Sequence, residues 1–417
     1  MALSVFLPVD LFRETCLFSH VQGLVADFTH VWNKCASQDF CMSTKYSPKE
    51  QRTREQYLKE FIRKLESEQK KTNIGFENIE IQDRIFSHVR TFFQTALGFR
   101  QRELDLILSP GFKKSTKDFV ELARRFDPTL KPADVFQACR NVWIMNGLQL
   151  MLGLPVKFTP SIFAYSMLYP HTDNYLDDAS ISKEAKAAFN NRFAQRLAGI
   201  DVKARNAHER TIYSLVAMIE DDFERVRYPK VFASLLAIHQ AQTKSVLLLG
   251  SENLTQEQVL KISLEKGGTS VLADGYLVAG DLNEDQARFM FGYGAYLQFL
   301  DDLQDVREDG ETGQRSIYTL EAKRSALDAI ANKTFYFGDC VLASQKGFAG
   351  KQVRSYTTLM RSSIQLMLLE ATGFAPDLFT TSYMKKIEKH SPFRFSCLRT
   401  LRKQHAPYYA SMFGKLL

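Results

Sequence analysis

Hydrophobic residues recur at helical spacing along almost the whole chain, and several of these runs begin with recognisable start signals. The residues SPKE at 47–50 form a capping box with proline at the first helical position, so they predict a charged, solvent-facing helix over Pro48–Lys71. Thr255 and Asn283 open two further helices in the same way. Alternation with a period of two is nearly absent, and no Asn-Gly or Asp-Gly turn joins β-branched runs. The pattern therefore predicts an all-α fold.

Glycine and proline positions divide this helical pattern. Pro110-Gly111 is expected to end a helix over residues 79–108, and Pro170 to kink or end the helix that starts at Pro160. A loop is expected over residues 307–316. Further helices are expected over residues 132–152, 182–197, 209–223, 230–249 and 284–305.

The length of 417 residues allows one large helical domain. We predict an N-terminal helical extension over residues 1–75 and a main α-helical domain over residues 76–417, with one continuous domain over 1–417 as the alternative. The six cysteines are scattered without a C-x-x-C pair, which indicates a reducing compartment and no structural zinc.

Targeting and charge patterns point to a cytoplasmic protein. The first residues, MALSVFLPVDLFRETC, lack the basic leader of a secretory signal, and no apolar run is long enough for an integral membrane segment. The formal charge of +7 permits an anionic ligand but does not indicate nucleic acid, because no nucleic-acid-binding module surrounds the basic patches. We therefore expect a soluble protein with no nucleic-acid partner.

The first candidate for chemistry is the stretch LYPHTDNYLDD at residues 168–178. Asp173 and Asp177 are four residues apart and would share one helix face, with Asp178 about 100° around the helix. Like charges at this spacing destabilise a helix. No basic residue lies among them to compensate.

The second candidate, QFLDDLQD, repeats this arrangement. Asp301 and Asp305 are four residues apart, Asp302 lies between them, and Gln298 precedes them by one turn. A single aspartate cluster is readily explained as a solvated helix face. Two such clusters, each preceded by an apolar and aromatic segment, are harder to explain in that way.

Paired carboxylate ladders suggest a divalent cation. Oxygen-only ligands suit a hard ion, and Mg²⁺ usually takes one or two carboxylates and completes its octahedron with water and substrate phosphates. The sequence therefore predicts a phosphate-bearing substrate. Glycine-rich phosphate loops, a Ser-His-Asp set and a Cys-His set are not recognisable, and His171 is interpreted as support for the first motif.

Two aspartate-rich motifs on separate helices, DNYLDD at 173–178 and Q-x-x-D-D-x-x-D at 298–305, resemble the class I isoprenoid synthase superfamily. The resemblance covers roughly residues 131–318. Members include trans-prenyl diphosphate synthases, squalene and phytoene synthases, and class I terpene cyclases. The resemblance implies a helical bundle around a deep apolar active-site cavity. In this cavity three Mg²⁺ ions would bind an allylic prenyl diphosphate. Such bundles commonly dimerise, so the resemblance makes a homodimer possible.

Departures from each branch help to choose among them. The paired arginines that follow the first motif of chain-elongating synthases are missing after Asp178. Both motifs have the D-x-x-x-D spacing of squalene-type synthases, but Gln298 and Asp302 make the second more similar to prenyl diphosphate synthases. This mixture resembles class IB terpene synthases. It implies a cyclase that ionises a C15 or C20 allylic prenyl diphosphate and releases diphosphate together with a terpene hydrocarbon or alcohol. The alternative is a trans-prenyltransferase, either a chain-elongating synthase or a head-to-head synthase.

The resemblance also implies residue roles. The catalytic, metal-binding residues would be Asp173, Asp177, Asp301 and Asp305. Asp178 and Asp302 would be further metal ligands or would support the ligands from behind, and Gln298 would orient a carboxylate or a bound water. Diphosphate-binding cations would come from Lys266, Arg315, Lys244, Arg307 and Arg394, with Arg192 and Arg196 as weaker candidates. Lys266 and Arg315 are favoured, because the resemblance places a diphosphate-binding lysine near the expected helix break at Gly267-Gly268 and a closing loop after the second motif. Such a break would also direct Lys266 and backbone N–H groups at an anion.

Aromatic residues near the carboxylates are the expected cavity lining. Aromatic faces stabilise a carbocation and exclude water, which favours Tyr165, Tyr169, Phe291 and Trp143. The bulk of Tyr169 would limit the depth of the cavity and favours a C15 or C20 chain over longer ones.

Overall fold

The structure is a computed structural model that describes residues 11–40, 42–71, 79–177, 180–249 and 254–404. At residues 69–71, 79–82, 173, 174 and 177 it describes the backbone but not the side chains. Helices make up the regular structure of these ranges, and no strand occurs in them, so the predicted all-α class is confirmed. None of the helices in these ranges combines the length and apolar character that crossing a lipid bilayer requires.

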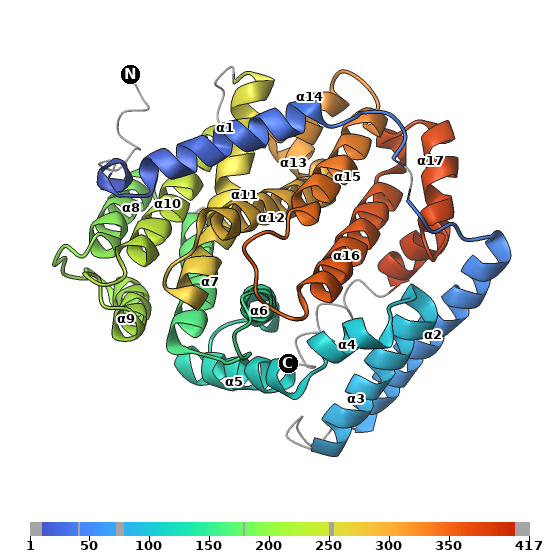
Figure 1. Cartoon of the computed structure of the whole chain (residues 1–417), viewed down its shortest axis with the longest axis horizontal. Helices are drawn as coiled ribbons and strands as arrows, with labels where there is room; N and C mark the ends of the chain where they lie inside the picture. Colours follow the sequence, from blue (N-terminus) through green and yellow to red (C-terminus); the bar gives the residue numbers. More distant parts are fainter. Residues whose placement is uncertain (1–10, 41, 72–78, 178–179, 250–253, 405–417) are drawn as a thin grey trace.

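The α-helices follow one another with short connections (Figure 1). The first nine are α1 Phe18–Lys34, α2 Pro48–Lys71, α3 Ile79–Phe92, α4 Gln101–Ile107, α5 Pro110–Phe126, α6 Pro132–Met151, α7 Pro160–Asp177, α8 Lys183–Leu197 and α9 Ala207–Asp222. The others are α10 Pro229–Ser245, α11 Gln256–Ala279, α12 Glu284–Gln304, α13 Val306–Thr312, α14 Ile317–Ala322, α15 Asp328–Ala343, α16 Val353–Phe374 and α17 Thr381–Ile387.

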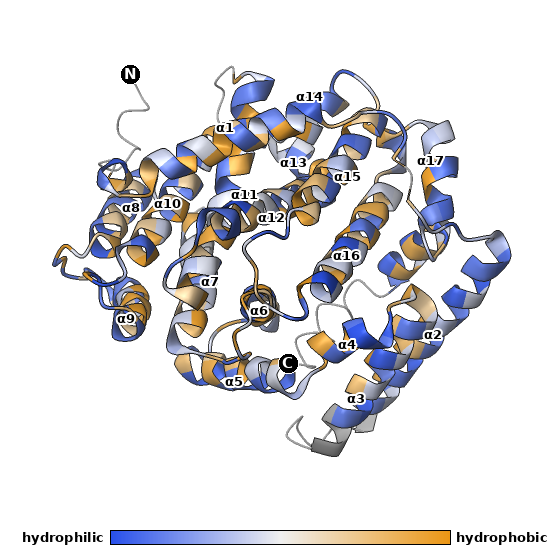
Figure 2. Cartoon of the chain, viewed as in Figure 1, coloured by the Kyte–Doolittle hydropathy of each residue, from blue (hydrophilic) through white to orange (hydrophobic). Residues whose placement is uncertain are grey.

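Most helix starts agree with the sequence pattern. The capping box at the start of α2 is formed in both directions, because Ser47 N–H donates to Glu50 Oε2 at 2.7 Å and Glu50 N–H donates to Ser47 Oγ at 3.3 Å. Thr255 and Asn283 cap α11 and α12 as predicted. Figure 2 shows long hydrophilic stretches along α2, as expected of a charged outer helix.

Two predictions about helix ends were wrong, and a third was wrong in one of its two alternatives. Pro110 does not end a helix but occupies the first position of α5, where its missing N–H costs nothing. The helix predicted over residues 79–108 is interrupted instead at Gly98, whose φ of 79° only glycine adopts readily, and α4 follows over Gln101–Ile107. Helix α7 does not end at Pro170 but continues through it to Asp177, while the alternative, a kink at Pro170, stays a prediction. Residues 307–312, expected to start a loop, belong to α13.

Helix α1 lies along the upper edge of the bundle in Figure 1 and shares the main core. The ring of Phe28 stacks on Phe291 of α12 with centroids 5.7 Å apart, and Trp32 lies 4.6 Å from Phe299. A separate, smaller apolar cluster joins α2 and α3 to residues near the C-terminal end. It includes Phe92 of α3 and Phe393. The domain boundary at residue 75 stays a prediction.

The central pair, α11 and α12, is packed with its backbones in contact. A Cβ atom at Gly267 would lie 2.5 Å from the carbonyl oxygen of Gly294, and one at Gly294 would lie 2.0 Å from the carbonyl oxygen of Gly267. Beside them, a Cβ at Gly268 would lie 2.5 Å from the ring of Phe291. The predicted helix break at Gly267-Gly268 was therefore wrong: α11 runs through it, and the glycines are there to let α12 approach.

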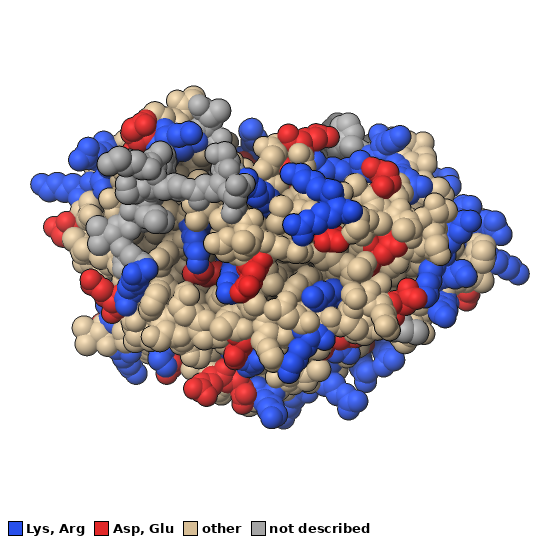
Figure 3. Space-filling view, turned by 90° about the horizontal axis from the view of Figure 1, so that it is seen from above, with Lys and Arg blue, Asp and Glu red and all other residues tan. Residues whose placement is uncertain are grey.

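Charged side chains of both signs are dispersed on the face that Figure 3 shows, with uncharged surface between them. This is the distribution that the nearly balanced totals of 54 basic and 47 acidic residues lead one to expect.

Substituting the crossing glycines tests how much the bundle depends on this contact. We expect Gly267→Ala and Gly294→Ala to lower the free energy of unfolding by about 1–3 kcal/mol or more, because the clashing atoms are backbone and cannot rotate away. Thermal or denaturant unfolding measures the effect. Gly23→Ala in α1 is the matched control: its Cβ would meet nothing within 4 Å, so stability should rise by about 0.5–1 kcal/mol. Equal effects at all three positions would contradict the proposed role of the crossing.

Candidate active site

A pocket of about 230 Å³ lies beside the α11–α12 crossing, with walls from α6, α7, α8, α10, α11 and α12. It brings together five of the predicted site residues, from three helices: Tyr165, Tyr169, Lys266, Gln298 and Asp301. Apolar side chains such as Ile144, Leu168, Leu197, Leu235, Ile238 and Val271 line the remainder together with several polar groups.

The charged end of the pocket is formed by the last turn of α12. Asp301 is exposed and lines the pocket, whereas Asp302 is buried between α12 and α11. Gln298 Nε2 donates to Asp302 Oδ1 at 2.8 Å, and Ser263 Oγ donates to Oδ2 at 3.3 Å. Burial raises the pKa of Asp302 to about 7, and the hydrogen bond from Gln298 opposes that rise. Gln298 thus orients a carboxylate behind the pocket wall.

The ladder of carboxylates extends further than the sequence motif. The spacing of four that joins Asp301 to Asp305 continues to Asp309 in α13, which was not among the predicted site residues although its spacing signals it. Partial burial and the charges of Asp301 and Glu308 raise the pKa of Asp305. Burial and the charges of Asp305 and Asp301 raise the pKa of Asp309 to about 6. These carboxylates are therefore close enough to repel one another.

Two cations face this negative charge. Lys266 of α11 lines the pocket, and its charge lowers the pKa values of Asp302 and Asp309 against the larger effect of burial. Arg140 of α6 also lines the pocket and lowers the pKa of Asp305 in the same sense. Arg140 was not predicted, since a single arginine in an apolar helix has no distinguishing local pattern.

The first acidic motif lies at the end of α7. Asp173 and Asp177 fall within this helix, but their side chains are outside the described residues, as is Asp178 altogether. Tyr169 and Thr172 of the same helix line the pocket. Asp173 is one turn beyond Tyr169, on the same face of α7. The backbone of α7 thus continues from the pocket-lining Thr172 directly into the first motif.

The donors at this end are the oxygen ligands that Mg²⁺ prefers. Among the side chains that the structure describes, no three acidic, histidine or cysteine residues converge on one point that could hold an ion. Mg²⁺ usually takes only one or two protein carboxylates, a number that the described aspartates of α12 supply. The predicted set of six ligands and three ions stays a prediction.

Three of the predicted diphosphate-binding cations are engaged elsewhere. Lys244 Nζ donates to Glu265 Oε2 at 2.5 Å, and Arg307 pairs with Asp377. Arg394 forms two side-chain hydrogen bonds to Glu55, at 2.8 and 2.6 Å, which join the C-terminal region to α2. None of the three is among the residues that line the described pocket.

Three other predicted residues also lie outside the pocket lining. The backbone N–H of Arg315 donates to the carbonyl of Leu248 at 3.0 Å, which places it beside the end of α10. Phe291 is fully buried against Phe28 and Gly268. Trp143 Nε1 donates to Thr116 Oγ1 at 2.9 Å, so its ring lies between α5 and α6.

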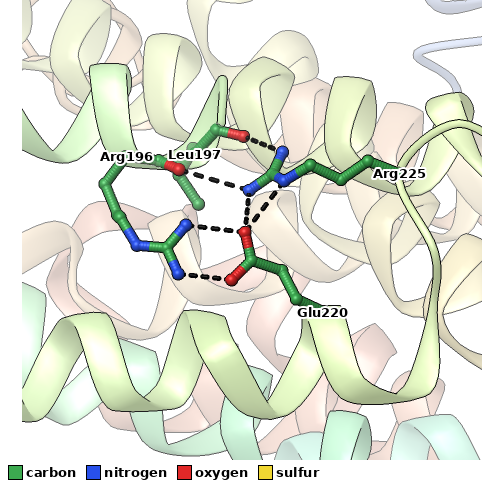
Figure 4. A network of polar contacts seen from close by, with 4 residues as sticks. All are labelled: Arg196, Leu197, Glu220 and Arg225. Carbon is green, nitrogen blue, oxygen red and sulfur yellow. Dashed lines mark hydrogen bonds and ion pairs between the residues drawn. The ribbon is translucent and has the colours of Figure 1, made fainter. Parts of the chain in front are cut away.

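The weaker arginine candidates of α8 have structural partners. Arg192 forms an ion pair with the buried Glu209. Figure 4 shows Arg196 bonded to Glu220, which also accepts from Arg225, while Arg225 Nη1 donates to the carbonyl of Leu197 at 2.7 Å. This network fixes the C-terminal end of α8 to α9 and leaves Arg196 committed to Glu220.

Behind the pocket wall, next to the pocket-lining Asn141, lies an unexpected buried carboxyl group. Asp274 of α11 has no solvent exposure and accepts a hydrogen bond from Asn141 Nδ2 of α6 at 3.0 Å. Its second oxygen has no hydrogen-bond partner among the described residues. Burial raises the pKa of Asp274 well above its usual range. The sequence signal is faint: a lone acid in the apolar run VLADGYLVA.

No model of a known protein family matches the chain, and no curated protein is significantly similar to it. A solved structure that resembles it is that of a geranylgeranyl pyrophosphate synthase. The two share 13% sequence identity with a TM-score of 0.31, over 79% of this chain and 98% of that chain. This TM-score is well below that of two proteins with the same fold, so the likeness carries no weight for what this chain does.

The raised pKa of Asp274 predicts a specific pH dependence of stability. The folded protein keeps this proton at pH values where the unfolded chain, with a pKa of about 3.9, has lost it. Folding stability therefore falls as the pH rises above about 4, until the folded pKa is reached. Asp274→Asn removes that cost, so its melting temperature should exceed that of the wild type at about pH 7, with the difference shrinking toward about pH 4.

Asp281→Asn is a control of opposite sign. The hydrogen bond from Lys230 lowers the pKa of Asp281, so its contribution is present at neutral pH and lost as the pH falls. This variant should be slightly less stable than the wild type at neutral pH and equal to it in acid. An Asp274→Asn variant that behaves like Asp281→Asn would show that Asp274 is ionised in the folded protein.

Proposed function

We propose that the protein is a Mg²⁺-dependent class I terpene synthase that ionises a C15 or C20 allylic prenyl diphosphate. The observation that carries this proposal is the pocket itself, which joins Asp301, the first carboxylate of the ladder, and Lys266 at one end to an aromatic and aliphatic lining at the other. A diphosphate with its counter-ions suits the first end, and an isoprenoid chain suits the second. The motif resemblance supports the same class.

The electrostatics of the charged end favour an occupied state. Asp301 and Asp305 lie at the C-terminal end of α12, and Asp173 and Asp177 lie at the C-terminal end of α7. The helix macrodipole is negative at these ends, so carboxylates there are unfavourable unless cations neutralise them. This arrangement supports a site that gains stability from bound divalent ions.

The chain's own cations would hold the other side of the diphosphate. Lys266 and Arg140 line the pocket from α11 and α6 and already interact with the acidic ladder. They would bind the diphosphate oxygens and orient the C–O bond of the ligand toward the apolar lining. When bound, Mg²⁺ supplies Lewis-acid stabilisation of the charge that develops on the departing diphosphate.

The aromatic lining would protect the product of ionisation. Tyr165 and Tyr169 of α7 lie beside Leu168 in the pocket wall. Aromatic faces stabilise a cation, and apolar walls exclude the water that would quench it. Tyr169 and Thr172 lie nearest the acidic end of α7, so the allylic carbon would be released next to an aromatic side chain.

The metal assignment predicts selective loss of activity in α12. Asp301→Asn should lower Mg²⁺-dependent turnover by about 100-fold or more and weaken Mg²⁺-dependent binding of inorganic diphosphate, with unchanged helical circular dichroism. Asp173→Ala should behave alike. The control is Asp285→Asn, the same chemical change at the opposite end of α12. Full activity in both motif variants would exclude the metal assignment.

A product assay distinguishes the terpene synthase from its alternatives. The protein would be incubated with Mg²⁺ and geranyl, farnesyl or geranylgeranyl diphosphate, with and without isopentenyl diphosphate, and the products identified by mass spectrometry. We expect a terpene hydrocarbon or alcohol from the C15 or C20 diphosphate alone. A longer prenyl diphosphate formed only with isopentenyl diphosphate would indicate a chain-elongating synthase. Coupling of two identical chains would indicate a head-to-head synthase. No product from any substrate would contradict the proposal.

A further inference from the structure

The inner end of the pocket carries a buried polar group that the proposed chemistry does not use. Lys266, Ser270 and Asp274 follow one another at intervals of four along α11, so they share one face of that helix. Lys266 and Ser270 line the pocket, and Asp274 continues the row one turn further into the protein. The row thus leads from the charged end to a carboxyl group beneath the inner end.

Asn141 connects this carboxyl group to the pocket. Its side-chain nitrogen donates to Asp274 Oδ1 at 3.0 Å and to Ser166 Oγ at 3.2 Å, and Asn141 itself lines the pocket. An amide nitrogen carries two N–H donors, and these two oxygens, together with the weaker sulfur acceptor of Met145 at 3.6 Å, occupy both. The carbonyl oxygen is therefore the hydrogen-bonding group that the Asn141 amide can offer to a ligand.

Holding Asn141 in this orientation is costly for the fold. A carboxyl group with no exposure and one oxygen without a described partner loses its hydration without full compensation. An apolar residue at position 274 would avoid that cost but would leave an N–H of Asn141 unpaired. The cost is understandable if the orientation of the amide matters in the pocket.

The surroundings limit what the amide oxygen can do. At this depth the pocket is lined by the aliphatic side chains of Ile144 and Val271, and the hydroxyl of Tyr165 donates to the carbonyl of Ser270 at 3.2 Å. An electron-rich oxygen in a half-buried position among such groups interacts more strongly with positive charge than one in bulk water. A neutral hydrocarbon chain gains nothing from it.

We propose that Asn141 contacts the isoprenoid chain and stabilises the positive charge that develops on it, with Asp274 as the residue that positions the amide. The inference rests on the proposed function: the allylic C–O bond breaks, its electron pair leaves with the diphosphate, and the chain retains the positive charge. Lys266 and the aspartates act on the leaving group, whereas Asn141 acts on the cation at the other end of the pocket.

Binding of charged and neutral chain analogues tests this inference without turnover. The probes are a C15 tertiary amine, which is protonated at neutral pH, and the hydrocarbon with carbon in place of nitrogen, each titrated calorimetrically with Mg²⁺ and inorganic diphosphate present. The wild type should prefer the amine. Asn141→Leu should reduce that preference by about tenfold while binding the hydrocarbon as tightly as before.

Variants of Asp274 separate positioning from packing. Asp274→Asn keeps an acceptor for Asn141 and should retain the preference for the amine, whereas Asp274→Leu should lose it although Asn141 is intact. Asn146→Leu is the control for a polar-to-apolar change in α6, since Asn146 is buried and bonded to Ser115 outside the pocket lining. It should keep the preference, and its melting temperature shows how much such a change costs α6.

The outcomes distinguish the two proposals. If the wild type prefers the amine and both Asn141→Leu and Asp274→Leu keep the full preference, the role of Asn141 is excluded while the proposed function stands. If Asn141→Leu does not fold, the contrast between Asp274→Asn and Asp274→Leu decides alone. If the wild type binds neither analogue, with or without Mg²⁺ and diphosphate, the proposed function fails and this inference fails with it.

Discussion

The contact between the backbones of α11 and α12 at Gly267 and Gly294 determines the geometry of everything around it. Because no side chain separates the two helices at this point, Lys266 and Gln298 lie on adjacent positions of one pocket wall. A pair of helices kept apart by larger residues would move these groups away from each other by the width of a side chain. The close approach also seats Phe291 on Gly268, where α1 covers it with Phe28. The charged end of the pocket and the apolar core on its far side therefore depend on one crossing.

This crossing gives the pocket two chemically different ends. The ends of α7 and α12 bring carboxylates to the negative poles of two helices, an arrangement that costs free energy until cations arrive. At the opposite end, the amide of Asn141 places a fixed dipole in the pocket wall, and the buried Asp274 behind the wall holds that amide. Under the proposed function, a ligand that is anionic at one end and apolar, with transient positive charge, at the other would satisfy both ends at once. The orientation of the bound chain would then follow from this polarity without reference to its exact length.

The sequence was a good guide wherever the deciding interactions are local. Capping boxes act over three residues, so the starts of α2, α11 and α12 could be predicted. The glycine pair in α11 was misinterpreted because the reason for it, the backbone of α12, lies 27 residues further along the chain at Gly294. Arg394 was misinterpreted for the same reason. Its flanking aromatic residues suggested a ligand-binding role, but it bonds to Glu55, which lies near the other end of the sequence. Local patterns do not contain such pairings.

The acidic motifs and the buried carboxyl show two further limits of sequence reasoning. Repetition at intervals of four made Asp301 and Asp305 recognisable, and the same rule reaches Asp309 once α13 is known to continue from α12. Asp274 has no such repetition, and an isolated acid in an apolar helix is equally compatible with a surface position. What distinguishes Asp274 is its depth in the bundle and its bond to Asn141, and both follow from the packing of α6 against α11. A residue whose role is to orient another residue across a helix interface leaves almost no trace in its own sequence neighbourhood, because the need it meets belongs to the interface.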